Sequence, residues 1–308
     1  MPFIIKINLM KMKAIKNILV PTDFSKTASL ALEHAAFMAK LFKADLYLLH
    51  VVEIHDSVFD IYNTGIMPND NSAIRQAVLE NLDKAAEKIG KENSINVIAD
   101  CKTGSITAEI VKSVNDNTID LVIMGTHGAH GFKEFFVGSN AYKTVNICSC
   151  PVITVQTNTK KLGFTNIILP IDDCFESRQK VDFTIAFAKA YAAKIHILGI
   201  IDDDSSDSDL EKFKVKLNSV EKSAKKAGVN FVTKTVKSND LGLDTLRYAR
   251  KVKADLISVL TDHESQYKVN FLGVFANKII NHSNVPILSI QSVELGVYDP
   301  VSLAGSNG

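Results

Sequence analysis

The sequence is poor in cysteine, in net charge and in long apolar runs, and each shortage excludes a class of protein. Its four cysteines form no Cys-x-x-Cys pair, so a disulfide framework has little support and a reducing compartment, the cytoplasm, is expected. The 35 basic and 34 acidic residues leave a formal charge of +1, without the positive excess of nucleic-acid-binding proteins. No apolar run reaches the roughly 18 residues of a membrane span. We therefore expect neither a nucleic-acid partner nor a membrane.

The two halves of the chain repeat one pattern, and such a duplication decides the architecture. Residues 16–23, KNILVPTD, align with residues 165–172, TNIILPID, at an offset of 149 positions (165 − 16). Residues 151–155 align with residues 286–290 at an offset of 135 positions (286 − 151). The second copy is therefore 14 positions shorter (149 − 135), and we expect the extra length of the first copy in its polar stretch 55–71.

Length and composition agree with two globular domains. The 308 residues suit two cores at roughly 150 residues per domain, and 46% hydrophobic with 22% charged residues is an ordinary globular composition. We predict domains at 16–156 and 164–291, between an N-terminal tail, 1–15, and a C-terminal tail, 292–308.

Each copy alternates short apolar runs with longer amphipathic segments, which is typical of βαβ units around a parallel sheet. A helix is predicted at 26–42, capped by Ser25. Its apolar spacing predicts a buried face made of Leu30, Ala31, His34, Ala35, Met38 and Leu41. Strands of the first copy are predicted at 16–22, 44–52, 95–101, 119–125 and 151–155.

A glycine-bearing loop follows the fourth predicted strand. Gly125, Gly128 and Gly138 lead to a helix that should begin at Ser139. Glycine permits close backbone approach and positive φ, so loop amides can point at one anion. A helix N-terminus adds unpaired N–H groups and a favourable dipole. The pattern predicts a phosphate-binding loop, although a plain strand-to-helix turn has the same glycines.

The end of the first predicted strand supplies the opposite side of such a site. Pro21, Thr22 and Asp23 stand there. In a doubly wound sheet, ligands bind at the carboxyl ends of the strands where the strand order reverses. If the first and fourth strands flank that reversal, Asp23 faces the glycine loop.

With these residues the chain resembles the universal stress protein family, in its ATP-binding branch. The resemblance runs in full from Lys16 through Val155 and more faintly from Thr165 through Ile290. The family motif is Gly, two residues, Gly, nine residues, then Gly and Ser or Thr, and it is matched by Gly125, Gly128, Gly138 and Ser139. The resemblance implies an α/β fold of two tandem, doubly wound, five-stranded parallel-sheet domains of strand order 3-2-1-4-5. Pairing of the two fifth strands, as in family dimers, would relate the copies by a pseudo-two-fold axis.

The resemblance also implies a site for ATP, or for ADP or AMP, with Mg²⁺ as a companion of the nucleotide. In ATP-binding members the acid after the first strand, here Asp23, contacts adenosine. The residues corresponding to Val51 and Met124 lie against adenine, and the glycines with Ser139 hold the phosphates. The implied set is Pro21, Thr22, Asp23, Val51, Met124, Gly125, His127, Gly128, Gly138, Ser139 and Asn140. Ala129 and Asn140-Ala141 depart from the family pattern, which suggests weaker phosphate binding or a preference for fewer phosphates.

The second copy departs from the motif. The offset of 135 places Leu260 at the first glycine and Val274 at the serine. Because a non-glycine residue at positive φ costs roughly 1–3 kcal/mol, we predict that the second copy is a scaffold without nucleotide. Its Asp172 should be a turn or cap residue.

Other chemistry-bearing clusters favour structural roles. His127 and His130 lack further ligands for a metal site. Cys148 and Cys150 are expected to be small core residues rather than a redox pair. The acidic run 202–209 lacks the glycine and the terminal Glu of a calcium loop, and is expected to cap the following helix.

These features predict a regulatory protein of the stress response whose ATP occupancy is read by a protein partner, with homodimerisation as another form of partnership. A slow ATPase or phosphotransferase is one alternative; no Gly-x-x-x-x-Gly-Lys loop supports it. A nucleotide-free assembly scaffold is the other.

Overall fold

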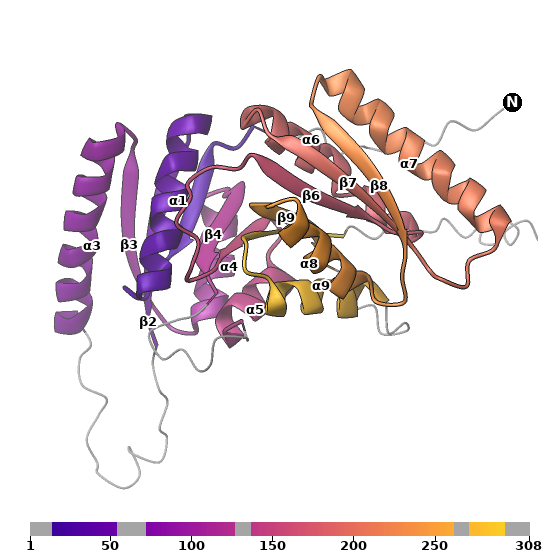
Figure 1. Ribbon diagram of the computed structural model, residues 1–308. Helices are drawn as coiled ribbons and strands as arrows, with labels where there is room; N and C mark the ends of the chain where they lie inside the picture. Colours follow the sequence, from indigo (N-terminus) through magenta and orange to yellow (C-terminus); the bar gives the residue numbers. More distant parts are fainter. Residues whose placement is uncertain (1–13, 54–71, 127–136, 262–270, 293–308) are drawn as a thin grey trace, which may run out of the picture.

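The computed structural model describes residues 14–53, 72–126, 137–261 and 271–292 (Figure 1). The predicted extra stretch 55–71 and most of both predicted tails lie outside these residues. The strands of the first half are β1 (Asn17–Pro21), β2 (Asp45–Val52), β3 (Val97–Thr103), β4 (Leu121–Gly125) and β5 (Val152–Val155). Those of the second half are β6 (Asn166–Ile171), β7 (Lys194–Ile201), β8 (Phe231–Lys237), β9 (Leu256–Thr261) and β10 (Ile287–Gln291).

All ten of these strands form one sheet. Its order is β3-β2-β1-β4-β5-β10-β9-β6-β7-β8, so each half has the predicted order 3-2-1-4-5. Neighbours within a half are parallel, whereas β5 and β10 pair antiparallel, with Ile153 opposite Leu288. The predicted fold class is confirmed, as is the pairing of the two copies through their fifth strands.

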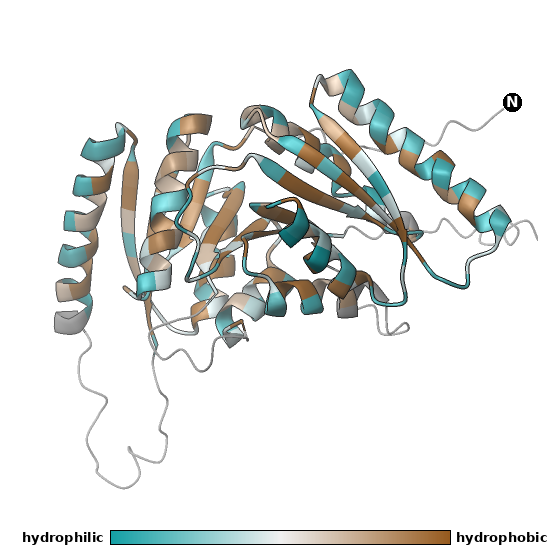
Figure 2. Ribbon diagram, viewed as in Figure 1, coloured by the Kyte–Doolittle hydropathy of each residue, from teal (hydrophilic) through white to brown (hydrophobic). Residues whose placement is uncertain are grey.

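Helices cover both faces of the sheet (Figure 1). One face carries α1 (Lys26–Phe42), α3 (Ser72–Asn93), α6 (Val181–Ala190) and α7 (Asp207–Ala227). The other carries α4 (Ile106–Asp116), α5 (Ser139–Ile147), α8 (Leu241–Lys251) and α9 (Phe271–His282). Figure 2 shows apolar strands between helices whose outer sides are hydrophilic, as expected for a sheet buried on both faces. No helix in the described ranges has both the length and the apolar character needed to cross a bilayer.

The predicted helix 26–42 is confirmed as α1, and the Ser25 hydroxyl accepts the Ala28 amide at 3.1 Å. Its buried face was predicted with one error, because Leu41 is 41% exposed whereas Ala31 and Met38 are fully buried. The five predicted strands of the first half lie within two residues of the observed ones.

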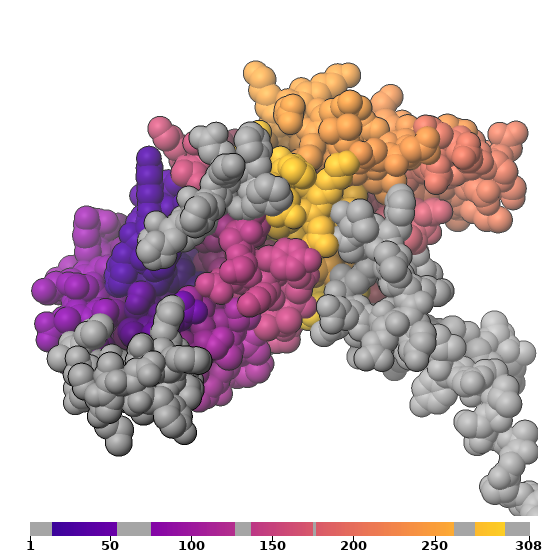
Figure 3. Space-filling model, turned by 90° about the horizontal axis from the view of Figure 1, so that it is seen from below, coloured from indigo at the N-terminus to yellow at the C-terminus, as the bar shows by residue number. Residues whose placement is uncertain are grey.

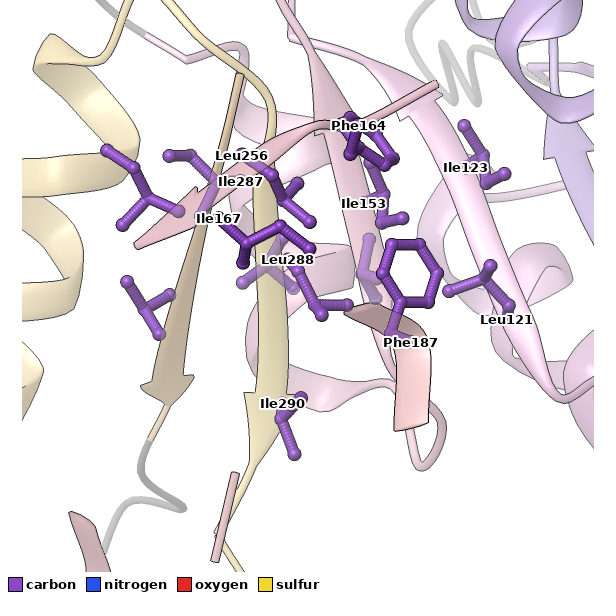
Figure 4. Close-up of a cluster of buried hydrophobic side chains, with 14 of the residues drawn as sticks. Leu121, Ile123, Ile153, Phe164, Ile167, Phe187, Leu256, Ile287, Leu288 and Ile290 are labelled. Carbon is purple, nitrogen blue, oxygen red and sulfur yellow. The ribbon is translucent and has the colours of Figure 1, made fainter. Parts of the chain in front are cut away.

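The hydrophobic core continues across the junction of the halves. Leu121 on β4, Ile153 on β5, and Leu288 on β10 are all fully or almost fully buried, and Figure 4 shows them in one cluster. On one face of the sheet, α1 meets α6 through aromatic rings, among which those of Phe42 and Phe187 lie 5.9 Å apart in a tilted arrangement. The two halves therefore share one interior.

Gly163, in the connection between the halves, is needed both for its conformation and for space. Its φ is +76°, and an added Cβ would lie 3.1 Å from Phe37 Cε1. Gly228 has a similar φ of +72°, with nothing within 4 Å of an added Cβ. Both Ala variants should lose about 1–2 kcal/mol to the left-handed backbone, and Gly163→Ala should lose more because it also displaces Phe37. Urea denaturation measures the difference, and equal losses would show that the contact with Phe37 is unimportant.

His34 should make stability depend on pH. Its side chain is 1% exposed and its ring lies 6.2 Å from that of Phe164, on the inter-half connection. Burial lowers the pKa of His34 from its ordinary value of 6.5, and the Thr159 backbone offsets part of that effect. The unfolded chain therefore binds more protons below pH 6.5, so stability should fall as the pH falls through that range.

Urea midpoints at pH 7.5 and pH 5.5 measure this dependence. His34→Leu should flatten it, leaving the contribution of His196, whose pKa is also lowered by burial. An unchanged slope in His34→Leu would refute the assignment.

Candidate functional site

The strand order of the first half reverses between β1 and β4, so the carboxyl ends of these two strands form the switch point of its sheet. The two strands are adjacent, with Ile18 opposite Leu121. The helices that follow them, α1 and α5, lie on opposite faces of the sheet (Figure 1), so the chain leaves the two strands in opposite directions. In open α/β sheets, ligands bind at such a position.

The loop after β1 is held by its own polar groups. Thr22 donates its amide to Leu49 O at 2.8 Å, and Asp23 accepts the Ser25 amide at 3.0 Å. The second half repeats this turn, because Asp172 accepts the Cys174 amide at 3.2 Å. The predicted turn role of Asp172 is confirmed. Asp23 is exposed, and its loop lies on the rim of the switch point.

Phe24 is a feature of this rim that the sequence analysis missed. It is a non-glycine residue with a φ of 62°, and its ring is 50% exposed. The ring lies 5.0 Å from that of His50, whose Nδ1 is 2.7 Å from Thr22 O. This contact ties His50, on β2, to the loop after β1. Strained backbone of this kind is concentrated at functional sites, but no sequence pattern signals it.

Gly125 ends β4 where the strand passes directly under the first turn of α1. A Cβ at this position would lie 2.9 Å from Thr27 Cγ2 and 3.0 Å from the Thr27 carbonyl carbon. Neither Gly125 nor Gly138 has a left-handed φ; that of Gly138 is −58°. The expectation of positive φ at these two glycines is therefore wrong, and close approach to a neighbouring backbone takes its place as the reason for glycine at 125.

The chain between β4 and α5 is anchored at both described ends. Thr126, 1% exposed, donates its amide to Val155 O at 3.0 Å, and its carbonyl accepts the Gly138 amide at 2.7 Å. The amide of Gly138 is thus already engaged, and the amides that follow it belong to Ser139 and Asn140. The predicted helix start at Ser139 is confirmed.

The N-terminus of α5 suits an anion. Its N-cap is Gly138, no side-chain hydrogen bond caps it, and its first turn contains no acidic residue. The helix dipole and the unpaired amides of a first turn attract negative charge. Ser139 is exposed and Asn140 is partly exposed, so both can be reached by a ligand.

The remaining residues of the predicted set are placed as follows. Val51 and Met124 are 9% and 6% exposed, so each presents a narrow apolar strip. Pro21, at the end of β1, is partly exposed. His127 and Gly128 lie outside the described residues, as does His130.

The corresponding position of the second half differs by a lysine and a leucine side chain. Lys216, from α7, donates to Asp172 O at 2.9 Å and to Cys174 O at 2.6 Å, which ties the loop after β6 to that helix. Burial lowers the pKa of Lys216, while the carboxylates of Asp172 and Asp173 oppose that shift. Leu260, at the position of Gly125, is fully buried.

Two further differences separate the halves. Gly199 replaces His50, and an added Cβ there would lie 2.7 Å from Leu217 Cδ1, so α7 packs close against β7. A short 3-10 turn, Phe175–Arg178, precedes α6. Lys180, which follows this turn, is 1% exposed and donates to Ser177 O at 3.0 Å. The first turns of α1 thus have no regular helical counterpart.

Comparison with known proteins assigns the chain to a family. The model of the universal stress protein family matches residues 14–156 and again residues 163–291. The chain belongs to the universal stress protein family. Among relatives, a universal stress protein of Methanocaldococcus jannaschii is 30% identical over 158 residues, which are 46% of this chain and 94% of the relative. One of Bacillus subtilis is 27% identical over 146 residues, 45% of this chain and 97% of the relative.

Solved structures of the family share the tandem architecture. A universal stress protein from Archaeoglobus fulgidus has a TM-score of 0.72 at 18% identity, over 91% of this chain and 99% of that one. One from Pseudomonas aeruginosa has a TM-score of 0.66 at 17% identity, over 91% and 95% of the two chains. At these identities the likeness establishes the fold.

Gly125→Ala should destabilise the first half. The new methyl would meet the Thr27 backbone at 3.0 Å, which cannot yield without moving α1, and such overpacking costs about 1–3 kcal/mol. Gly138→Ala is the matched control, because its Cβ would meet only Thr126 O, at 3.2 Å. Urea denaturation should give the larger loss for Gly125→Ala. Equal losses would contradict close approach as the reason for glycine at 125.

Proposed function

We propose that the first half binds ATP, or ADP or AMP, between the loop after β1 and the N-terminus of α5, and that the protein acts as a nucleotide-dependent regulator. One observation carries this proposal. Where the strand order reverses between β1 and β4, β4 ends at Gly125 and leads to α5, whose N-terminus has no side-chain cap. It sets the electropositive N-terminus of α5 beside the carboxyl ends of β1 and β4, a position that suits phosphate binding.

Family membership supports the identity of the ligand. Gly125, Gly128, Gly138 and Ser139 fit the motif of the ATP-binding branch, and Asp23 stands at the position that contacts adenosine there. In this proposal the amides of Ser139 and Asn140 hold phosphate oxygens, and the apolar strips of Val51 and Met124 lie against the base. Mg²⁺ would arrive bound to the phosphates, since the first turn of α5 offers no acidic ligand.

The second half serves as a scaffold in this proposal. Lys216 ties the loop after β6 to α7, and α7 packs closely on β7 at Gly199. Leu260 is buried at the position of Gly125. A single nucleotide per chain is expected, with occupancy read by a protein partner or by a second copy of the chain.

The direct test is calorimetric titration of the purified protein with ATP, ADP, AMP and, as a control, GTP. Adenine nucleotides should bind at one site per chain. Mass spectrometry of the denatured protein should also detect any nucleotide that co-purifies. Multiple-turnover phosphate release would instead favour the ATPase alternative, and no binding of any nucleotide would favour the scaffold alternative.

Ser139→Asp should weaken ATP binding without unfolding the protein. A carboxylate in the first turn of α5 interacts favourably with the helix dipole, by about 0.3–1 kcal/mol, but repels phosphate. We expect at least a tenfold rise in the ATP dissociation constant and a melting temperature equal to or slightly above that of the wild type.

Ser105→Asp is the matched control, because Ser105 is an exposed N-cap without a side-chain cap hydrogen bond, at the start of α4. It should bind ATP like the wild type. Undiminished ATP binding by Ser139→Asp would refute the proposed site.

A further inference from the structure

The second half of the chain accepts a hydrogen bond from the segment that directly precedes α5. Asn281, in the last turn of α9, accepts the backbone amide of Val137 on its side-chain oxygen at 3.3 Å, across 144 positions of sequence. Figure 3 shows the surfaces of these two regions in direct contact on the underside of the molecule. The antiparallel pairing of β5 with β10 brings α5 and α9 together on one face of the sheet.

This hydrogen bond falls at the approach to the proposed phosphate site. Val137 is followed by Gly138, the N-cap of α5, whose own amide is bonded to Thr126 O. Two successive amides are therefore fixed, one by the first half and one by the second. The next amides along the chain, those of Ser139 and Asn140, are the ones proposed to hold phosphate, so Asn281 helps to set where they lie.

This helix is short, and it packs against α4, β5 and β10 through a narrow buried face. It has nine residues, of which Ala141, Thr144 and Val145 are buried, whereas Ile147 is 50% exposed. At its far end, the Asn146 carbonyl accepts a hydrogen bond from Gln291 Nε2 on β10 at 2.9 Å. A short helix with a narrow buried face depends more on such polar contacts than a long amphipathic helix does. Both contacts come from the second half.

We propose that Asn281 is a positioning residue for the phosphate-binding end of the first-half site, so that the second half contributes to nucleotide binding within one chain. The inference rests on the proposed function. Coupling of this kind is reciprocal: bound phosphate that orders the first turn of α5 also strengthens its contact with α9, which gives the second half a means of sensing occupancy.

The test compares ATP with adenosine in calorimetric titrations of the full chain. Asn281→Leu keeps the size of the side chain but removes the acceptor. Loss of one hydrogen bond should weaken ATP binding by about two- to tenfold and leave adenosine binding unchanged. Gln291→Leu is the matched control, since it removes an inter-half hydrogen bond at the other end of the same helix. It should change ATP affinity by less than twofold.

Hydrogen exchange gives a readout without ligand. Peptides that contain Val137 to Asn140 should exchange faster in Asn281→Leu, and Asn281→Asp, which keeps an acceptor oxygen, should restore slow exchange. Wild-type ATP affinity in Asn281→Leu, or equal weakening of ATP and adenosine, overturns this inference while leaving the proposed function in place. A wild-type protein that binds neither ligand overturns both.

Discussion

The antiparallel pairing of β5 with β10 is the constraint on which the rest of the molecule depends. It merges two parallel five-stranded units into one sheet and makes their cores continuous through residues such as Ile153 and Leu288. It also fixes which helices meet across the junction: α1 contacts α6 through aromatic rings on one face, and α5 approaches α9 on the other. The proposed site is built on one half but lies beside this junction.

Within the first half, the site is shaped by backbone proximity more than by unusual conformation. Gly125 lets β4 run within van der Waals distance of the Thr27 backbone, so the start of α1 packs closely on the end of β4 at the switch point. Thr126 then binds both β5 and Gly138, which sets the approach to α5. The single strained residue on the described rim is Phe24, next to the predicted adenosine contact.

Local signals in the sequence were sufficient for most of the fold. The spacing of apolar residues and the Ser25 cap predicted α1, and alternation of apolar runs predicted a parallel sheet, since both depend on neighbours in the chain. The strand order and the pairing of the fifth strands came from the family resemblance. Leu41 was misassigned because helical periodicity does not say how wide the buried face is.

The parts of the site that escaped prediction are contacts between distant segments. The approach of Thr27 to Gly125, the Lys216 tether and the Asn281 hydrogen bond each join residues that no motif connects. A glycine in the sequence indicates that a side chain is excluded, but not whether φ or a neighbouring atom excludes it. The predicted nucleotide contacts remain predictions that the titrations above address.

Joining the two units in one polypeptide changes what evolution can do with them. In an association of separate subunits, every substitution in the shared edge strand occurs on both sides at once, and assembly weakens on dilution. Here β5 and β10 are tethered, at an effective concentration of the order of millimolar for a short connection, so their pairing is independent of how much protein the cell makes. One unit could thus lose the first two glycines of its motif and acquire Leu260 and Lys180 while the assembled sheet persisted. Asymmetry of this kind is available to a fused pair and not to two identical subunits.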